Sequence, residues 1–238
     1  MDFKLKDACT ALNIALALYA VNLTFEGRLE LAAWVIFASW FADGLDGLVA
    51  RWTKTGNEFG AHFDNQADLF IFSVAPGFYA YAVYQDYSPA IGALLGAVII
   101  TVGCIRLARF NVKALIYPGF WIGYPRPALG LFVVFLLSSR LFAAYQPYLP
   151  AAALILALTA LNLSYIPFRN HKTRFTAFER WACRCTWASI PTAMYFDCVW
   201  DVGLAWSVIY LLLPFTPLYA QYRDPIRHYV AEWKAGRA

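Results

Sequence analysis

The chain has 238 residues, of which 61% are hydrophobic and only 14% are charged, and its mean hydropathy is +0.52. A soluble domain typically carries about 25% charged residues, so this composition excludes an ordinary soluble protein and favours a membrane protein. The net charge of +4 is not accompanied by any nucleic-acid-binding motif. We therefore expect no nucleic-acid partner and assign the excess positive charge to contact with anionic membrane lipids.

Apolar stretches follow one another along the chain, each close to the roughly 20 residues that a helix needs to cross a bilayer. Eight are predicted, approximately at 8–24, 30–51, 59–84, 89–112, 127–145, 148–167, 181–199 and 202–221. The first is expected to be retained rather than cleaved as a signal peptide, because no small-x-small cleavage site follows it. The predicted fold is an all-α integral membrane protein, a single transmembrane domain over residues 1–238 with about eight transmembrane helices.

The basic residues predict how these helices are oriented. If the amino terminus lies inside, all of the 19 lysines and arginines except Arg28 and Arg140 fall on the inner side. This asymmetry is what the positive-inside rule requires. Both termini and the connection after the second helix are then cytoplasmic, and a prokaryotic inner membrane is the expected location.

Two aspartates interrupt the apolar sequence near the end of the second predicted helix. Asp43 and Asp46 share a helix face with two small residues, Gly47 and Ala50, because the four positions are spaced 0, 3, 4 and 7. An ionised carboxylate in a membrane helix costs roughly 2.5–3.5 kcal/mol, so such residues usually face a protein interior and serve a function. The small residues leave room for a phosphate-bearing ligand, and Arg51 can offer a bidentate fork to a diphosphate.

A second acidic face follows on the third predicted helix, where Asp64 and Asp68 are four residues apart and Gly60 precedes Asp64 by four. The intervening sequence WTKTGN has the composition of a short turn, so the two acidic faces are expected to meet in a hairpin. Converging carboxylates would repel each other unless a cation lay between them. Oxygen-only ligands suit Mg²⁺, Mn²⁺ or Ca²⁺, and two such ions can clamp a displacement at phosphorus; His62 is expected to point away.

The pattern Asp-x2-Asp-Gly-x2-Ala-Arg-x8-Gly-x3-Asp-x3-Asp resembles the signature of the CDP-alcohol phosphotransferases. It is matched by Asp43, Asp46, Gly47, Ala50, Arg51, Gly60, Asp64 and Asp68. The resemblance covers roughly residues 5–145. It implies a six-helix core over about 5–170, with additional helices over about 180–221. It also implies an enzyme that moves a phosphatidyl-type group from a CDP-linked lipid to an alcohol and releases CMP.

The resemblance further implies roles for the matched residues. Asp43, Asp46 and Asp64 would be metal ligands, and Asp68 would be a fourth ligand or the general base. The CDP moiety would be contacted by Asn13, Asp43, Gly47, Ala50, Arg51 and Gly60. The implied cofactor is Mg²⁺ or Mn²⁺, as two ions, with Ca²⁺ as a third candidate. The family also leads us to expect a homodimer.

Three later segments, SVAPGFYAY, IRLARFNV and FWIGYPRPALG, resemble the membrane-embedded phosphatidylserine synthases within this family. Arg106, Arg109 and Asn111 from the second segment are predicted to bind the acceptor or the lipid phosphate. The resemblance favours CDP-diacylglycerol as donor and L-serine as acceptor. Asn65 and Gln66 depart from the usual Ser-Leu-Ala between the last two aspartates.

Three alternatives stay open. The acceptor could instead be glycerol 3-phosphate, inositol phosphate or choline, and Arg126 keeps a phosphorylated acceptor in consideration. The donor could be an archaeal ether lipid. A protein of another class, a cation transporter with an acidic site, would predict inverted repeats, and no repeat is evident in the sequence.

Overall fold

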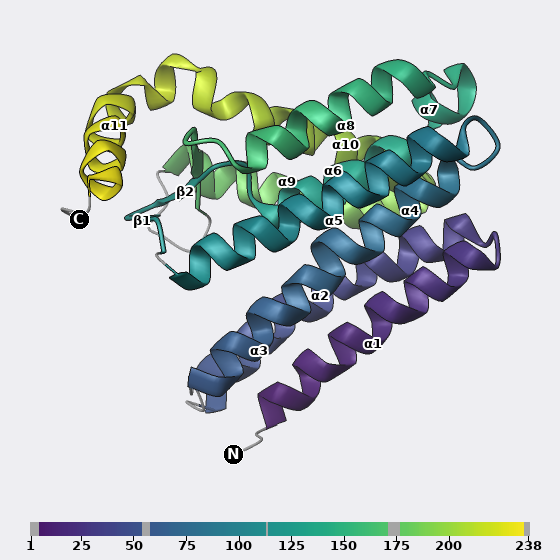
Figure 1. Cartoon of the computed structure of the whole chain (residues 1–238), viewed down its shortest axis with the longest axis horizontal. Helices are drawn as coiled ribbons and strands as arrows, with labels where there is room; N and C mark the ends of the chain where they lie inside the picture. The colour runs from purple at the N-terminus through teal and green to yellow at the C-terminus, as the bar shows by residue number, and fades with distance from the viewer. Residues whose placement is uncertain (1–4, 54–57, 113, 171–176, 236–238) are drawn as a thin grey trace.

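The computed structural model describes residues 5–53, 58–112, 114–170 and 177–235, and most of them are helical (Figure 1). The α-helices are α1 (Leu5–Phe25), α2 (Leu29–Thr53), α3 (Glu58–Leu69), α4 (Ala75–Val83), α5 (Pro89–Val112), α6 (Arg126–Ser138), α7 (Arg140–Tyr145), α8 (Tyr148–Asn162), α9 (Ala177–Tyr195), α10 (Val199–Leu212) and α11 (Ala220–Lys234). A π-helical segment, Phe70–Val74, joins α3 to α4, and two 3-10 turns, Leu213–Phe215 and Pro217–Tyr219, lie between α10 and α11. The mainly helical fold class is therefore confirmed.

The expectation of an all-α protein is wrong in one respect, because a small antiparallel sheet is present. Its strands are β1 (Ile116–Tyr117), β2 (Phe120–Ile122) and β3 (Pro167–Arg169), in the order β1-β2-β3. The turn between β1 and β2 is Pro118-Gly119, with Gly119 at a φ of 85°, which is the sequence typical of a type II turn. The β-branched and aromatic residues on both sides of this pair carried the signal for a hairpin.

Two of the described helical segments are long and apolar enough to cross a membrane, namely Asp7–Phe25 and Pro89–Val112. A third is added if Val199–Phe215 and Ala220–Lys234 form one broken span, although these two parts are bent by 73°. Helices α6 and α8 are apolar but shorter. The predicted number of eight spans is not confirmed by the described part of the chain.

Two predicted stretches end earlier than expected because of a serine in one and two prolines in the other. The stretch 127–145 is divided at Ser139, whose backbone is extended and whose hydroxyl accepts a hydrogen bond from the Phe142 N–H at 3.1 Å. Serine at a helix N-cap begins a new helix in this way. The stretch 202–221 ends as an α-helix at Leu212, and Pro214 and Pro217, which lack an N–H, begin the irregular turns that follow.

The π-helical segment follows the acidic part of α3 directly. Pro76 has no N–H, so it cannot bond the Phe72 carbonyl four residues earlier, and the N–H of Ala75 bonds the carbonyl of Phe70 instead. A Cβ at Gly130 of α6 would lie 2.7 Å from the Phe72 carbonyl oxygen. The glycine therefore permits α6 to pack closely against the π-helical segment that follows α3.

The ends of the elements separate into two groups in Figure 1. The start of α1, the end of α2, the start of α3, the sheet and α11 lie toward the left of the view, together with both marked termini. The α1–α2 and α4–α5 connections and α7 lie at the opposite end. The core between them is formed by fully buried side chains, which include Leu23, Phe72, Tyr84, Phe132 and Ile155.

Candidate functional site

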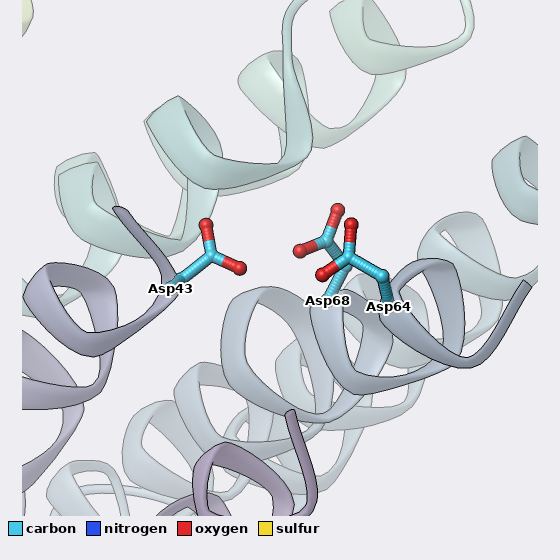
Figure 2. A group of neighbouring side chains, drawn as sticks. All are labelled: Asp43, Asp64 and Asp68. Carbon is cyan, nitrogen blue, oxygen red and sulfur yellow. The ribbon is translucent and has the colours of Figure 1, made fainter. Parts of the chain in front are cut away.

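Three aspartates from two helices converge at the site. Asp43 belongs to α2, whereas Asp64 and Asp68 lie four residues apart on α3 and therefore on one face of that helix. Figure 2 shows the Asp64 and Asp68 carboxylates together, with the Asp43 carboxylate pointing toward them from the other helix. One carboxylate oxygen from each residue lies within 4.8 Å of the others. The predicted approach of the two acidic faces is confirmed for these three residues.

The donor set at this cluster fits a hard divalent cation. All three groups are carboxylates of intermediate burial, and like charges this close repel one another more strongly than they would in open water. A bound cation would remove that repulsion, and oxygen ligands are those that Mg²⁺, Mn²⁺ and Ca²⁺ prefer. His62 is exposed and is not a member of the cluster, as expected.

For the remaining motif residues of α2, the structure describes the helix backbone alone. The helix backbone continues to Thr53, but the side chains of Asp46, Gly47, Ala50 and Arg51 lie outside the described residues. Their predicted roles as metal ligand or CDP contacts stay predictions.

The predicted CDP contacts on the other helices lie in packed surroundings. Asn13 of α1 is 1% exposed, Gly60 of α3 is also buried, and α1 packs directly against α3. Between the last two aspartates Asn65 is half-buried and Gln66 is exposed. Gly60 therefore lies on the helix that carries Asp64 and Asp68, Asn13 lies on a helix packed against it, and Gln66 is exposed.

Arg126, the first residue of α6, is a member of the site that the motif did not predict. Its Nη2 atom lies 3.4 Å from Oδ2 of Asp68, and the two side chains are only 10% and 22% exposed. Asp43 and Asp64 are also close enough to interact with its charge. Its position between two prolines in YPRP, where a helix can begin, had kept it in consideration only for a phosphorylated acceptor.

Arg106 and Arg109 of α5 donate to backbone oxygens at the end of α8, and Arg106 also donates to one in the loop before α6. Arg106 donates to the carbonyls of Asn162 and Gly123, and Arg109 donates to the carbonyl of Leu163 at 3.1 Å. Arg109 also lies over the ring of Tyr165, 5.6 Å from its centroid. These bonds give both arginines a structural role, and their predicted binding of the acceptor or lipid phosphate stays a prediction.

Asn111 is exposed in the last turn of α5. No contact of its side chain with the acidic cluster is found among the described residues, so its predicted role stays a prediction.

The loop before Arg126 is fixed by the same network. Gly123 has a φ of 80°, and a Cβ there would lie 2.5 Å from the Asn162 carbonyl oxygen. Asn162 is fully buried and donates from Nδ2 to the Tyr124 carbonyl at 2.8 Å, while the Tyr124 N–H bonds to the Leu161 carbonyl at 3.1 Å. Sequence reasoning missed Asn162, because an asparagine at the end of an apolar helix carries no motif.

Tyr124 itself is completely buried. Burial raises the pKa of its phenol well above the ordinary value, so the hydroxyl stays protonated and donates to the Ala128 carbonyl at 3.4 Å. The side chain thus links the loop to the first turn of α6 and helps to set the position of Arg126.

The fold and this site define a helical protein with apolar spans and a carboxylate cluster suited to a divalent cation. The chain belongs to the CDP-alcohol phosphatidyltransferase family, whose sequence model matches residues 3–168. The family depends on divalent metal. Together with the apolar helices, this membership makes the chain a membrane protein.

Similar proteins include three with related names. A CDP-diacylglycerol–serine O-phosphatidyltransferase of Helicobacter pylori is 40% identical over 127 residues, which cover 52% of this chain and 53% of the relative. A protein of the same name from Bacillus subtilis is 31% identical over 170 residues, which cover 71% of this chain and 88% of the relative. An archaetidylserine synthase of Methanothermobacter thermautotrophicus is 31% identical and covers 69% of both chains. The chain thus spans about half the length of its Helicobacter relative.

Proposed function

We propose that this protein transfers the phosphatidyl group of CDP-diacylglycerol to the hydroxyl of L-serine, forming phosphatidylserine and releasing CMP. The convergence of Asp43, Asp64 and Asp68 carries the proposal, because it assembles three of the family's acidic motif positions within 4.8 Å. The names of the relatives support both the donor and the acceptor. We propose further that residues 1–238 form one catalytic unit.

In this proposal Asp43, Asp46 and Asp64 hold the divalent cations, and Asp68 is a ligand or the general base. Two Mg²⁺ or Mn²⁺ ions, or Ca²⁺, would neutralise the donor diphosphate and the charge that develops on the departing CMP. The CDP moiety would be contacted by Asn13, Asp43, Gly47, Ala50, Arg51 and Gly60. Helix spacing on α2 and α3 and the buried positions of Asn13 and Gly60 support these assignments.

The chemical step needs one proton transfer and one displacement. Asp68 accepts the proton of the serine hydroxyl, and the serine oxygen forms a bond to the phosphorus that carries diacylglycerol. The bond between this phosphorus and the bridging oxygen of the diphosphate breaks, and CMP leaves with that oxygen. The protein contributes position and electrostatic complementarity, which can supply several kcal/mol of the barrier reduction.

Serine is favoured over the other alcohols by the relatives' names. Archaetidylserine synthase and the bacterial serine transferases have names that point to different donor lipids and the same acceptor. Arg106, Arg109 and Asn111 would then bind the acceptor or the lipid phosphate through donors that are not engaged with the carbonyls of α8.

We also propose that the helices make about eight membrane passages, with the acidic cluster and both termini on the cytoplasmic side of a prokaryotic inner membrane. The grouping of both termini, the end of α2, the start of α3 and α11 toward one end supports this orientation (Figure 1). Arg28 lies in the α1–α2 connection at the opposite end, and Arg140 begins α7 there. A homodimer completes the proposal on family grounds.

The proposal is tested by incubating purified protein with CDP-diacylglycerol, Mg²⁺ or Mn²⁺ and one alcohol at a time. The alcohols are L-serine, glycerol 3-phosphate, inositol phosphate and choline, and a parallel series uses a CDP-linked ether lipid. CMP release and the mass of the lipid product are measured. Serine should give phosphatidylserine at the highest rate. Faster transfer to another alcohol would overturn the acceptor, and no CMP release with any alcohol would overturn the reaction.

A further inference from the structure

We propose that Arg126 selects the acceptor, because its guanidinium binds the carboxylate of an amino-acid alcohol beside the acidic cluster. This inference rests on the proposed function, since it requires an alcohol to attack at Asp43, Asp64 and Asp68. It adds a specificity-determining residue that lies outside the acidic motif.

The first observation is a buried donor without an acceptor. The Arg126 side chain is 10% exposed, and Nη2 is its contact with Asp68. Its Nη1 atom is buried and has no hydrogen-bond partner among the described residues. A buried donor left in this state destabilises the protein, and an anion that offers an oxygen would remove the penalty. The planar fork of a guanidinium matches the two oxygens of a carboxylate.

The second observation is that the position of Arg126 is fixed by buried neighbours. Asn162 holds the Tyr124 carbonyl, and Pro125 precedes Arg126 with a φ of −64° as the N-cap of α6. Pro125 provides no side-chain cap, so the positive end of the helix dipole adds to the charge of the guanidinium. A rigid cation at a helix N-terminus suits recognition of a small anion.

The third observation concerns the charge that is available for the anion. Asp68 contacts Arg126, and Asp43 and Asp64 also interact with its charge. Part of the hydrogen-bonding capacity of Arg106 and Arg109 is already used by backbone carbonyls. One guanidinium in an acidic setting suits a singly charged carboxylate, whereas a doubly charged phosphate would need further donors. The nearby carboxylates also suit the ammonium group that an amino acid carries.

This arrangement would place the acceptor for reaction. Arg126 is in direct contact with Asp68, so an amino acid whose carboxylate lies on Arg126 has its hydroxyl close to the proposed base. Ethanolamine and choline have a hydroxyl but no carboxylate, so they would lose this contact. Arg126 would therefore give serine an advantage over these two alcohols, which lack a carboxylate.

The test compares L-serine, L-serinamide and ethanolamine as acceptors for purified wild-type protein, with CMP release as the readout. Loss of a charged hydrogen-bonded contact should lower kcat/KM for serinamide and ethanolamine by about 10- to 100-fold relative to serine. Arg126→Gln should raise the KM for serine by a similar factor and abolish the preference. The KM for CDP-diacylglycerol should change little. Arg126→Lys, which keeps the charge and loses the fork, should give an intermediate preference.

Arg140→Gln is the matched control, because Arg140 is 63% exposed and pairs with Asp197 and Asp201 at the other end of the molecule. It should keep the wild-type preference. Equal use of serine and serinamide by the wild type would overturn the inference even if no Arg126 variant folded. A variant that slows all three acceptors equally, or that raises only the KM for the donor, would also overturn it. Absence of CMP release by the wild type with every alcohol would instead overturn the proposed function, and this inference with it.

Discussion

Two charged regions near one another differ in how their charges are balanced. In the arginine–carbonyl network, which is Arg106 and Arg109 with the carbonyls of Gly123, Asn162 and Leu163, each cation faces backbone oxygens of the protein. In the acidic cluster of Asp43, Asp64 and Asp68, three like charges face one another, with one oxygen of each within 4.8 Å of the others.

The difference indicates that the arginine–carbonyl network stabilises the fold and that the acidic cluster serves the reaction. The network satisfies carbonyls at the end of α8, which have no partner within that helix, and it holds the loop that precedes α6. The cluster concentrates negative charge, which a bound divalent cation would neutralise. Arg126 connects the two regions, because it follows the fixed loop and contacts Asp68. Substitutions in the network should therefore change stability first, and substitutions in the cluster should change catalysis first.

The largest effect is expected for Asp68→Asn. Asparagine keeps the shape of the side chain but cannot accept the proton of the attacking alcohol, so CMP release should fall by about 10²- to 10⁴-fold. The thermal unfolding midpoint in detergent should stay close to that of the wild type. Full wild-type activity in this variant would refute the assignment of Asp68 as the base.

Gly123→Ala should produce the largest loss of stability. The φ of 80° costs an alanine about 1–2 kcal/mol, and the new Cβ would meet the Asn162 carbonyl at 2.5 Å, which adds about 1–3 kcal/mol. Chemical or thermal denaturation of the purified protein measures the change in free energy of unfolding. An unchanged stability would mean that the loop before Arg126 is not fixed as described.

Asp43→Asn should weaken cation and donor binding together. Loss of one carboxylate should raise the Mn²⁺ concentration for half-maximal CMP release by about 10- to 100-fold, and the KM for CDP-diacylglycerol should rise with it. Asp201→Asn is the control, since Asp201 pairs with Arg140 away from the cluster. If both variants had the same metal dependence, Asp43 would not be a ligand.

Gly27→Ala should have the smallest effect of the four changes. Gly27 has a φ of 72°, but nothing lies within 4 Å of the position its Cβ would take. The loss of unfolding free energy should therefore come from backbone strain alone, about 1–2 kcal/mol. The specific activity of the folded protein should be unchanged. If Gly27→Ala lost as much stability as Gly123→Ala, the close contact between Gly123 and the Asn162 carbonyl would not explain the effect at Gly123.

The acidic cluster could be predicted because its information is local. The four-residue spacing of Asp64 and Asp68 and the turn composition before them determine a face and a hairpin, and these place Asp43 opposite. The helical class followed similarly from the long apolar stretches. The number of spans does not follow from the apolar stretches alone, because a single residue such as Ser139 ends one helix and begins another inside an apolar run.

The rest of the site depends on contacts between distant parts of the chain. Arg126 and Asp68 are 58 residues apart, and Asn162 and Tyr124 are 38 residues apart. No helical spacing relates such positions, so their association is decided by how α3, α6 and α8 pack. The pairing of β2 with β3 is of the same kind. Arg106 was predicted to bind the acceptor or the lipid phosphate, and no sequence pattern indicated its carbonyl partners, which are 17 and 56 residues away.

The central claim is that the carboxylates of Asp43, Asp64 and Asp68 support transfer from CDP-diacylglycerol by binding a divalent cation. The most direct measurement is the initial rate of CMP release from CDP-diacylglycerol and L-serine by protein stripped of metal with a chelator, before and after Mn²⁺ is restored. We expect no release before addition and full release after it in the wild type, with a shifted metal requirement in Asp43→Asn. A wild-type rate that is the same with and without the metal would contradict the claim.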